Sequence, residues 1–170
     1  MNCVNHSLGI VLLLLSSING VSASKVGGVC EHPYFASTKF PKVNSHKGPG
    51  NQFKVAFAYI SPGVPVLITA KFGHWRRIVD PYGEESWIHK SKLSPKRSLI
   101  VSDQKGTLLR DGNDAGARVI ACLKKNVVMT LLAIDGNWCK VEVRNGSDGK
   151  KYVGWVEKGK VFGAVDAETL

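Results

Sequence analysis

Aromatic and cationic side chains recur in two similar stretches of this 170-residue chain. All four tryptophans lie in these stretches: Trp75, Trp87, Trp138 and Trp155. A flat indole ring can stack on a sugar ring or a peptide, although it can equally pack inside a core. Arg76 and Arg77 follow the first tryptophan, and a guanidinium can meet a carboxylate through two parallel hydrogen bonds. The two arginines point to opposite faces of a regular strand, so at most one of them would contact a given ligand.

The sequence predicts no catalytic residue, metal site or cofactor. Its serines, histidines and acids fall in no recognisable nucleophile turn or metal-binding spacing. Cys30-x-His32 is half of a metal site but has no second pair at ligand spacing. His46, His74 and His89 could meet on one repeat, or each could lie solvated near a turn or strand end. The hypothesis is therefore a non-enzymatic, metal-free binding role.

The elements that position these side chains are predicted to be strands. One stretch runs over 73–78, followed by a polar turn and Ser86-Trp87-Ile88, and the other runs over 136–141, followed by a longer turn and Gly154-Trp155-Val156. Each stretch reads as turn, strand, hairpin and strand. With the segments before them, each repeat contains five short strands at roughly ten-residue spacing, which is typical of a small all-β barrel.

The predicted organisation has four parts. They are a signal peptide at 1–23, an irregular arm at 24–42, the first repeat at 43–101, and the second repeat with a C-terminal tail at 102–170. Within the arm, Tyr34-Phe35-Ala36 could form a short strand. A barrel of about 60 residues is marginally stable alone. The apolar run Leu99-Ile100-Val101 needs burial, so we expect it to dock the two barrels side by side.

The first 23 residues have the features of an export signal. An apolar core runs from Leu8 to Leu15, and Val21-Ser22-Ala23 places small residues before a cleavage point that would leave Ser24 first. No lysine or arginine precedes the core, which leaves an uncleaved anchor as the alternative. We expect an exported protein, periplasmic or extracellular, with no membrane span after cleavage.

Composition and charge narrow the class of partner. Apolar residues make up 44% of the chain, too many for a disordered protein, and the formal net charge is +10. A basic protein favours acidic partners. Because the cations are scattered along the chain rather than clustered, no nucleic acid is expected.

Three cysteines would remain after signal cleavage. Cys122 and Cys139 lie in one repeat, and in an oxidising compartment a bridge between them would contribute about 3 kcal/mol in the chain-entropy estimate. This pair is the predicted disulfide, and Cys30 would then be free or intermolecular. The alternative is that all three are reduced.

The ordered motifs of the first repeat resemble those of the bacterial SH3-like domain family. They are Val43-Asn44-x-x-Lys47-Gly48-Pro49-Gly50, Gly73-x-Trp75-x-Arg77-Ile78 and Gly83-x-x-x-Trp87-Ile88. The second repeat is similar through Leu109-Arg110, Gly136-x-Trp138-x-Lys140-Val141 and Gly154-Trp155-Val156. It departs from the pattern in having no Gly-Pro-Gly turn, while the first repeat has His46 where the family commonly has arginine.

The resemblance implies two small tandem SH3-like barrels that bind cell-wall peptide or glycan. The alternative is a protein–protein interaction module for an envelope or host protein. We expect ligand contact on the first repeat, at His46, Trp75, Arg77 and Tyr82. The first repeat retains the Gly-Pro-Gly turn beside this surface, whereas the second has a longer hairpin that could cover the corresponding groove.

Overall fold

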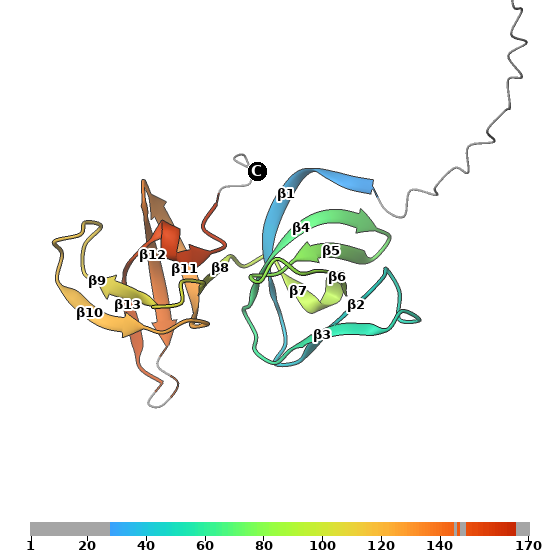
Figure 1. Ribbon diagram of the computed structural model, residues 1–170, viewed down its shortest axis with the longest axis horizontal. Coiled ribbons are helices and arrows are strands. Elements are labelled where there is room, and N and C mark those ends of the chain that lie inside the picture. Colours follow the sequence, from blue (N-terminus) through green and yellow to red (C-terminus); the bar gives the residue numbers. More distant parts are fainter. Residues whose placement is uncertain (1–27, 145, 147–148, 166–170) are drawn as a thin grey trace, which may run out of the picture.

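The computed structural model describes residues 28–144, 146 and 149–165, which form two β-sheets (Figure 1). The predicted signal peptide and its cleavage point lie outside these residues. Within the described part, no helix is long and apolar enough to cross a lipid bilayer. Two short 3-10 turns are the helical elements found there, so the all-β prediction is confirmed.

The two sheets contain seven strands each. The first sheet consists of β1 (Gly28–Thr38), β2 (Val43–His46), β3 (Val55–Tyr59), β4 (Pro65–Phe72), β5 (Trp75–Val79), β6 (Glu85–His89) and β7 (Leu93–Ser94), with the 3-10 turn η1 (Lys90–Lys92). The second consists of β8 (Ser98–Val101), β9 (Thr107–Arg110), β10 (Val119–Leu123), β11 (Val128–Asp135), β12 (Trp138–Arg144), β13 (Lys151–Glu157) and β14 (Val161–Phe162), with η2 (Lys158–Lys160).

Both sheets have the same strand order. The first is β3-β2-β6-β5-β4-β1-β7 and the second is β10-β9-β13-β12-β11-β8-β14, so each strand of the second sheet takes the place of the strand seven earlier. Residue pairs across the strands repeat as well, since Trp87 lies opposite Arg77 and Trp155 lies opposite Lys140. The prediction of two tandem barrels of one design is confirmed.

The first repeat begins earlier than predicted. Residues 28–38 form β1, which pairs with β4 and β7, so the prediction of an irregular arm over 24–42 is wrong from Gly28 onward. Pro33 and the polar residues around it hide the alternating pattern of a strand in the sequence. The neighbouring strands nevertheless hold this segment and bury its last four residues, from Phe35 to Thr38.

The second repeat also begins earlier than predicted. Leu99-Ile100-Val101 belongs to β8, which pairs with β11 and β14 in the second sheet, and all four residues of β8 are buried. The change from one sheet to the other therefore falls at 95–97 rather than after residue 101. The run is strongly apolar because it lies inside the second barrel, where Leu99 and Val101 are part of the core.

The barrels contact each other through several separate groups. The Ser98 hydroxyl donates a hydrogen bond to the Gly63 carbonyl at 2.6 Å. The Phe35 and Phe162 rings meet edge to face with centroids 5.4 Å apart. β8 also contacts β4 of the first barrel, so this strand takes part in the contact between the barrels. Leu99 and Val101 themselves point into the core of the second barrel, and the run is not the separate docking segment that the sequence suggested.

Alternation along the strands decides which side chains face outward from the first barrel. Ile78 of β5 and Ile88 of β6 are fully buried in the core, which they share with Val43, Val66 and Ile68. Successive side chains of a strand point to opposite faces. The neighbours of Ile78 and Ile88 along the chain, among them Arg77 and His89, therefore point away from the core.

Candidate functional site

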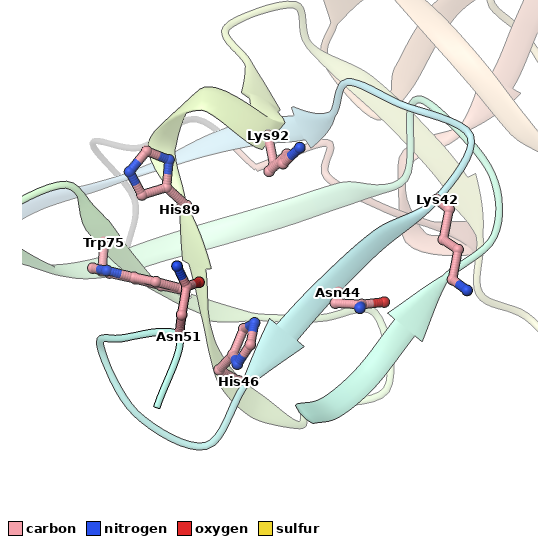
Figure 2. A pocket seen from close by; sticks show the side chains of 7 residues that line it. All are labelled: Lys42, Asn44, His46, Asn51, Trp75, His89 and Lys92. Atoms are coloured by element: carbon pink, nitrogen blue, oxygen red, sulfur yellow. The ribbon is translucent and has the colours of Figure 1, made fainter. Parts of the chain in front are cut away.

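A hollow of about 310 Å³ lies on the outer surface of the first barrel. Figure 2 shows the seven side chains that line it: Lys42, Asn44, His46, Asn51, Trp75, His89 and Lys92. They come from β2, β5, β6, η1 and the segments directly before and after β2. The strands bring them together because β2 lies beside β6, and β6 beside β5, in the first sheet.

A row of aromatic rings crosses this hollow. The Trp75 ring lies between two histidines, with its centroid 5.3 Å from that of His46 and 5.6 Å from that of His89. Both contacts are edge to face, an arrangement that aromatic rings favour. His74 continues the row, at 5.8 Å from His89. The sequence did not decide whether these three histidines meet or lie apart. In the structure they meet around Trp75.

His46 closes the loop that forms one wall of the hollow. Its Nδ1 lies 2.8 Å from the Phe53 carbonyl oxygen, and a carbonyl can only accept, so Nδ1 carries the proton. In the second repeat, Arg110 takes the same place and donates to the Ala117 carbonyl at 2.7 Å. Closing the loop therefore requires a hydrogen-bond donor at this position in both barrels. In neutral His46 the proton is on Nδ1, so Nε2 is a hydrogen-bond acceptor.

His89 has the opposite hydrogen-bonding pattern, because its Nδ1 is an acceptor. Its Nδ1 accepts the backbone N–H of Ser91 at 3.3 Å and lies 2.8 Å from the Ser91 hydroxyl. The proton of the neutral ring is therefore on Nε2. Partial burial lowers the pKa of His89 below its usual value, and the nearby positive charges of His74, Lys90, Lys92 and Arg76 lower it further.

The lining is electropositive. Lys42 and Lys92 lie on it, and none of its seven residues is an aspartate or glutamate. The Lys92 ammonium also lies 5.0 Å from the centroid of the Phe40 ring, a cation–π contact that helps to hold this side chain in place. Among the residues that the structure describes, no three His, Cys, Asp or Glu side chains are grouped as metal ligands would be. The arrangement suits non-covalent binding of an anionic or polar ligand.

Only two of the four predicted contact residues line this hollow. His46 and Trp75 lie together, but Arg77 points outward beside them and is held elsewhere, since its Nε donates to the Thr69 hydroxyl at 3.1 Å and its Nη1 lies 3.9 Å from Glu85. Tyr82 lies in the β5–β6 turn, at the far end of β5 from Trp75.

Tyr82 instead contacts the second barrel. Its hydroxyl donates to the Asn126 amide oxygen at 3.0 Å, and the Lys125 ammonium lies 5.9 Å from the centre of its ring. Tyr82 therefore contributes to the contact between the barrels rather than to the hollow.

Several residues that line the hollow were not predicted from the sequence. Lys42, Asn51 and Lys92 carry no motif that distinguishes them from surface residues of other strands and loops. Asn44 belongs to the motif that begins at Val43, but that motif does not show which way its side chain points. His89 had a usable signal, because the short hairpin after β5 sets the pairing of Trp75 with His89. Counting back from that turn would have placed the two side chains opposite each other.

The corresponding surface of the second barrel has a different character. Arg110, Trp138 and Glu157 stand where the first barrel has His46, Trp75 and His89, as the strand pairing shows. Lys160, the last residue of η2 as Lys92 is of η1, donates to Asp103 at 2.8 Å. This hydrogen bond lowers the pKa of Asp103 and raises that of Lys160. In the second barrel the charge of the equivalent lysine is therefore balanced by a carboxylate, and a histidine is replaced by an acid.

The predicted Cys122–Cys139 disulfide is not formed in the structure. Cys139 is fully buried and points into the core of the second barrel, whereas Cys122 is exposed on the outer face of β10. Two side chains on opposite faces of a barrel wall cannot be bridged without moving the backbone. The sequence predicted a strand at each cysteine, but it did not indicate to which face of the barrel wall each side chain would point.

No curated protein matches the chain. Among solved structures, NlpC2 from Trichomonas vaginalis is similar at 13% identity and a TM-score of 0.32, over 76% of this chain and 47% of that one. NlpC1 from the same organism is similar at 12% identity and a TM-score of 0.33, over 92% and 51%. The chain thus spans about half the length of these two proteins.

The family model described as bacterial SH3 domain matches the chain twice, at residues 39–95 and 104–163. The two matches fall on the two sheets, and together they cover most of the chain. The protein therefore belongs to the bacterial SH3 domain family.

Proposed function

We propose that this protein is a non-enzymatic, exported binding module that recognises cell-wall peptide or glycan through the hollow of its first barrel. Bacterial SH3 domains are binding modules and are often associated with the cell wall. The observation that carries the proposal is the half-buried Trp75 ring between His46 and His89, within an electropositive lining.

The hollow matches the proposed ligand in size and chemistry. Its volume of about 310 Å³ is at the lower end of the range for ligand sites, roughly 300–1,000 Å³. It suits a short peptide segment or a single sugar unit rather than a folded partner. Asn44 and Asn51 supply amide donors and acceptors, and Lys42 and Lys92 supply positive charge for the carboxylates of a wall peptide.

Replacing Trp75 with alanine is expected to weaken binding to insoluble peptidoglycan about tenfold or more. An aromatic contact contributes about 0.5–1.5 kcal/mol beyond the area it buries, and the change also removes the ring that separates the two histidines. About 1.4 kcal/mol corresponds to tenfold in the dissociation constant. Sedimentation of the mature chain with purified peptidoglycan, over a range of wall concentrations, measures the effect.

The matched control is Trp138→Ala, at the same position in the second barrel. We expect this variant to bind the wall like the parent protein, and circular dichroism must show that both variants are folded. A folded Trp75→Ala protein that sediments as the parent does would remove the hollow as the binding site.

Export is the second part of the proposal, and the apolar core from Leu8 to Leu15 with the small residues at 21–23 supports it. We expect protein recovered from the cell envelope or the medium to begin at Ser24. N-terminal sequencing makes this measurement, and a recovered chain that begins at Met1 would contradict cleavage.

A second candidate function is binding of a protein partner at the edge of the first sheet. β3 is the outermost strand there and pairs only with β2 among the described strands. Val55 and Ile60, at and just after this strand, are 50% and 84% exposed. An open strand edge can accept an extended segment of another protein. A parent protein that does not sediment with peptidoglycan would remove the wall-binding proposal and leave this one.

A further inference from the structure

We propose that the hollow of the first barrel selects ligands that carry a carboxylate, and that His46 and His89 take up protons when such a ligand binds. This inference rests on the proposed function, because it concerns the same hollow. It goes further by naming the ligand group that is recognised and by coupling recognition to pH.

The first argument is the charge of the lining. Lys42 and Lys92 are the cations on it, and no lining carboxylate offsets them. In the second barrel the lysine that corresponds to Lys92 is paired with Asp103 at 2.8 Å. The first barrel therefore offers a cationic surface in which the counter-charge is supplied by whatever binds, which favours an anionic group over a neutral sugar.

The second argument is that both histidines can gain a proton and still have a hydrogen-bond partner for Nδ1. His46 already donates from Nδ1 to the Phe53 carbonyl, so protonation adds a donor at Nε2 and leaves the loop closed. His89 would exchange the Ser91 backbone donor for the Ser91 hydroxyl, which lies 2.8 Å from Nδ1 and can accept as well as donate. The protonated site would therefore present more donors in the same backbone framework.

The third argument is the charge around the two rings. The charged or titratable groups that face or flank the two rings are Lys42, His74, Arg76, Lys90 and Lys92. Partial burial lowers the pKa of His89, and the positive charges of His74, Lys90, Lys92 and Arg76 lower it further. A bound carboxylate would offset that repulsion and favour the protonated rings.

The sign of the pH effect follows from this linkage. A ligand that raises the pKa of a histidine binds more tightly to the protonated protein. Affinity should therefore increase as the pH falls through the histidine pKa of the complex. It should level off below the histidine pKa of the free protein, provided that the pH remains above the pKa of the ligand carboxylate.

The experiment compares untreated peptidoglycan with peptidoglycan whose carboxylates have been converted to amides by carbodiimide and ammonia. The mature chain is sedimented with each at pH 5.5, 6.5 and 8.0. We expect affinity for the untreated wall to rise about tenfold from pH 8.0 to pH 5.5, within the usual range for coupling between two bound species. We expect binding to the amidated wall to be weaker and nearly independent of pH.

The variant His46→Arg separates protonation from loop closure. Arginine is the residue at the same position of the second barrel, where it makes the same bond to a loop carbonyl. It carries a permanent charge, so the variant should bind the untreated wall at pH 8.0 more tightly than the parent does and should show a smaller change with pH. A merely structural role for His46 would leave the pH profile unchanged.

The outcomes distinguish this inference from the proposed function. Equal binding to untreated and amidated wall would overturn carboxylate selection, and equal binding at pH 5.5 and 8.0 would overturn proton uptake. Either result leaves the wall-binding function in place. Failure to bind either wall at any of the three pH values would overturn both proposals.

Discussion

Replacing Asp80 with alanine is expected to lower the free energy of unfolding of the first barrel by about 3 kcal/mol, because its buried carboxylate organises the hairpin between β5 and β6. The residue is 3% exposed. Its Oδ1 accepts the backbone N–H groups of Tyr82 at 2.8 Å and Glu84 at 3.0 Å. A hydrogen bond to a charged group contributes about 1.5–3 kcal/mol, and alanine would remove the acceptor of both bonds.

Urea unfolding of the Asp80→Ala protein measures this loss, and hydrogen exchange assigns it to the first sheet. The control is Asp111→Ala, where an exposed carboxylate pairs with the exposed Arg118 at 3.0 Å. Surface pairs of this kind contribute about 0–1 kcal/mol, so the control should change little. An Asp80→Ala protein as stable as its control would show that the hairpin does not depend on the carboxylate.

The Asp80→Ala substitution should also alter the ionisation of the Tyr59 hydroxyl. Burial raises the pKa of the Tyr59 hydroxyl to about 12, and the Asp80 carboxylate adds to the effect. Because the pKa is higher in the folded protein than in the unfolded one, this group's contribution to stability is complete below pH 10 and is lost as the pH rises through 12. In Asp80→Ala, tyrosinate absorbance should therefore show Tyr59 ionising at lower pH than in the parent.

Replacing Gly154 with alanine is expected to destabilise the second barrel by about 3 kcal/mol, at the upper end of the usual cost of overpacking. A Cβ at this position would lie 2.5 Å from the Arg110 carbonyl oxygen and 2.9 Å from Cγ of Leu109. The first of these atoms belongs to the backbone of β9, which cannot move without disturbing its pairing with β10 and β13.

The first barrel shows how a side chain can be accommodated at the same place. Ser86 lies opposite Ile78 as Gly154 lies opposite Val141, so the two positions correspond. In the first barrel the residue that corresponds to Leu109 is the smaller Ser45, which leaves room for the Ser86 side chain. The glycine of the second barrel is therefore matched to a larger neighbour.

Urea unfolding of Gly154→Ala tests this packing argument. The control is Gly159→Ala in η2, where an added Cβ would meet no atom within 4 Å. We expect the control to lie within about 0.5 kcal/mol of the parent, as for other surface changes. Equal stability of the two variants would mean that β9 and β13 separate easily, contrary to their close approach here.

Local pattern was a good guide to most of the strands and a poor guide to the ends of the repeats. Alternating residues and turn chemistry identify β4, β5 and β6 because these features depend on neighbours in the sequence. β1 has no such pattern and is held by β4 and β7. The sequence also did not show that Leu99-Ile100-Val101 belongs to the second barrel. An apolar run indicates that a segment is buried, but it does not indicate against which part of the protein.

The sequence by itself determined that the chain forms two similar barrels, and it placed His46 and Trp75 near a possible ligand site. It did so because repeats, turns and period-two alternation are local properties of the chain. The tertiary structure decided the composition of the hollow, because its lining residues span 42–92 and meet only through long-range strand pairing. The same pairing holds Arg77 beside Thr69 and Glu85, while contact with the second barrel holds Tyr82 against Asn126. Thr69 and Glu85 lie near Arg77 in the sequence, but only the pairing of β4 and β6 with β5 brings them beside it. Asn126 lies far from Tyr82 in the sequence, so no local pattern could have named it.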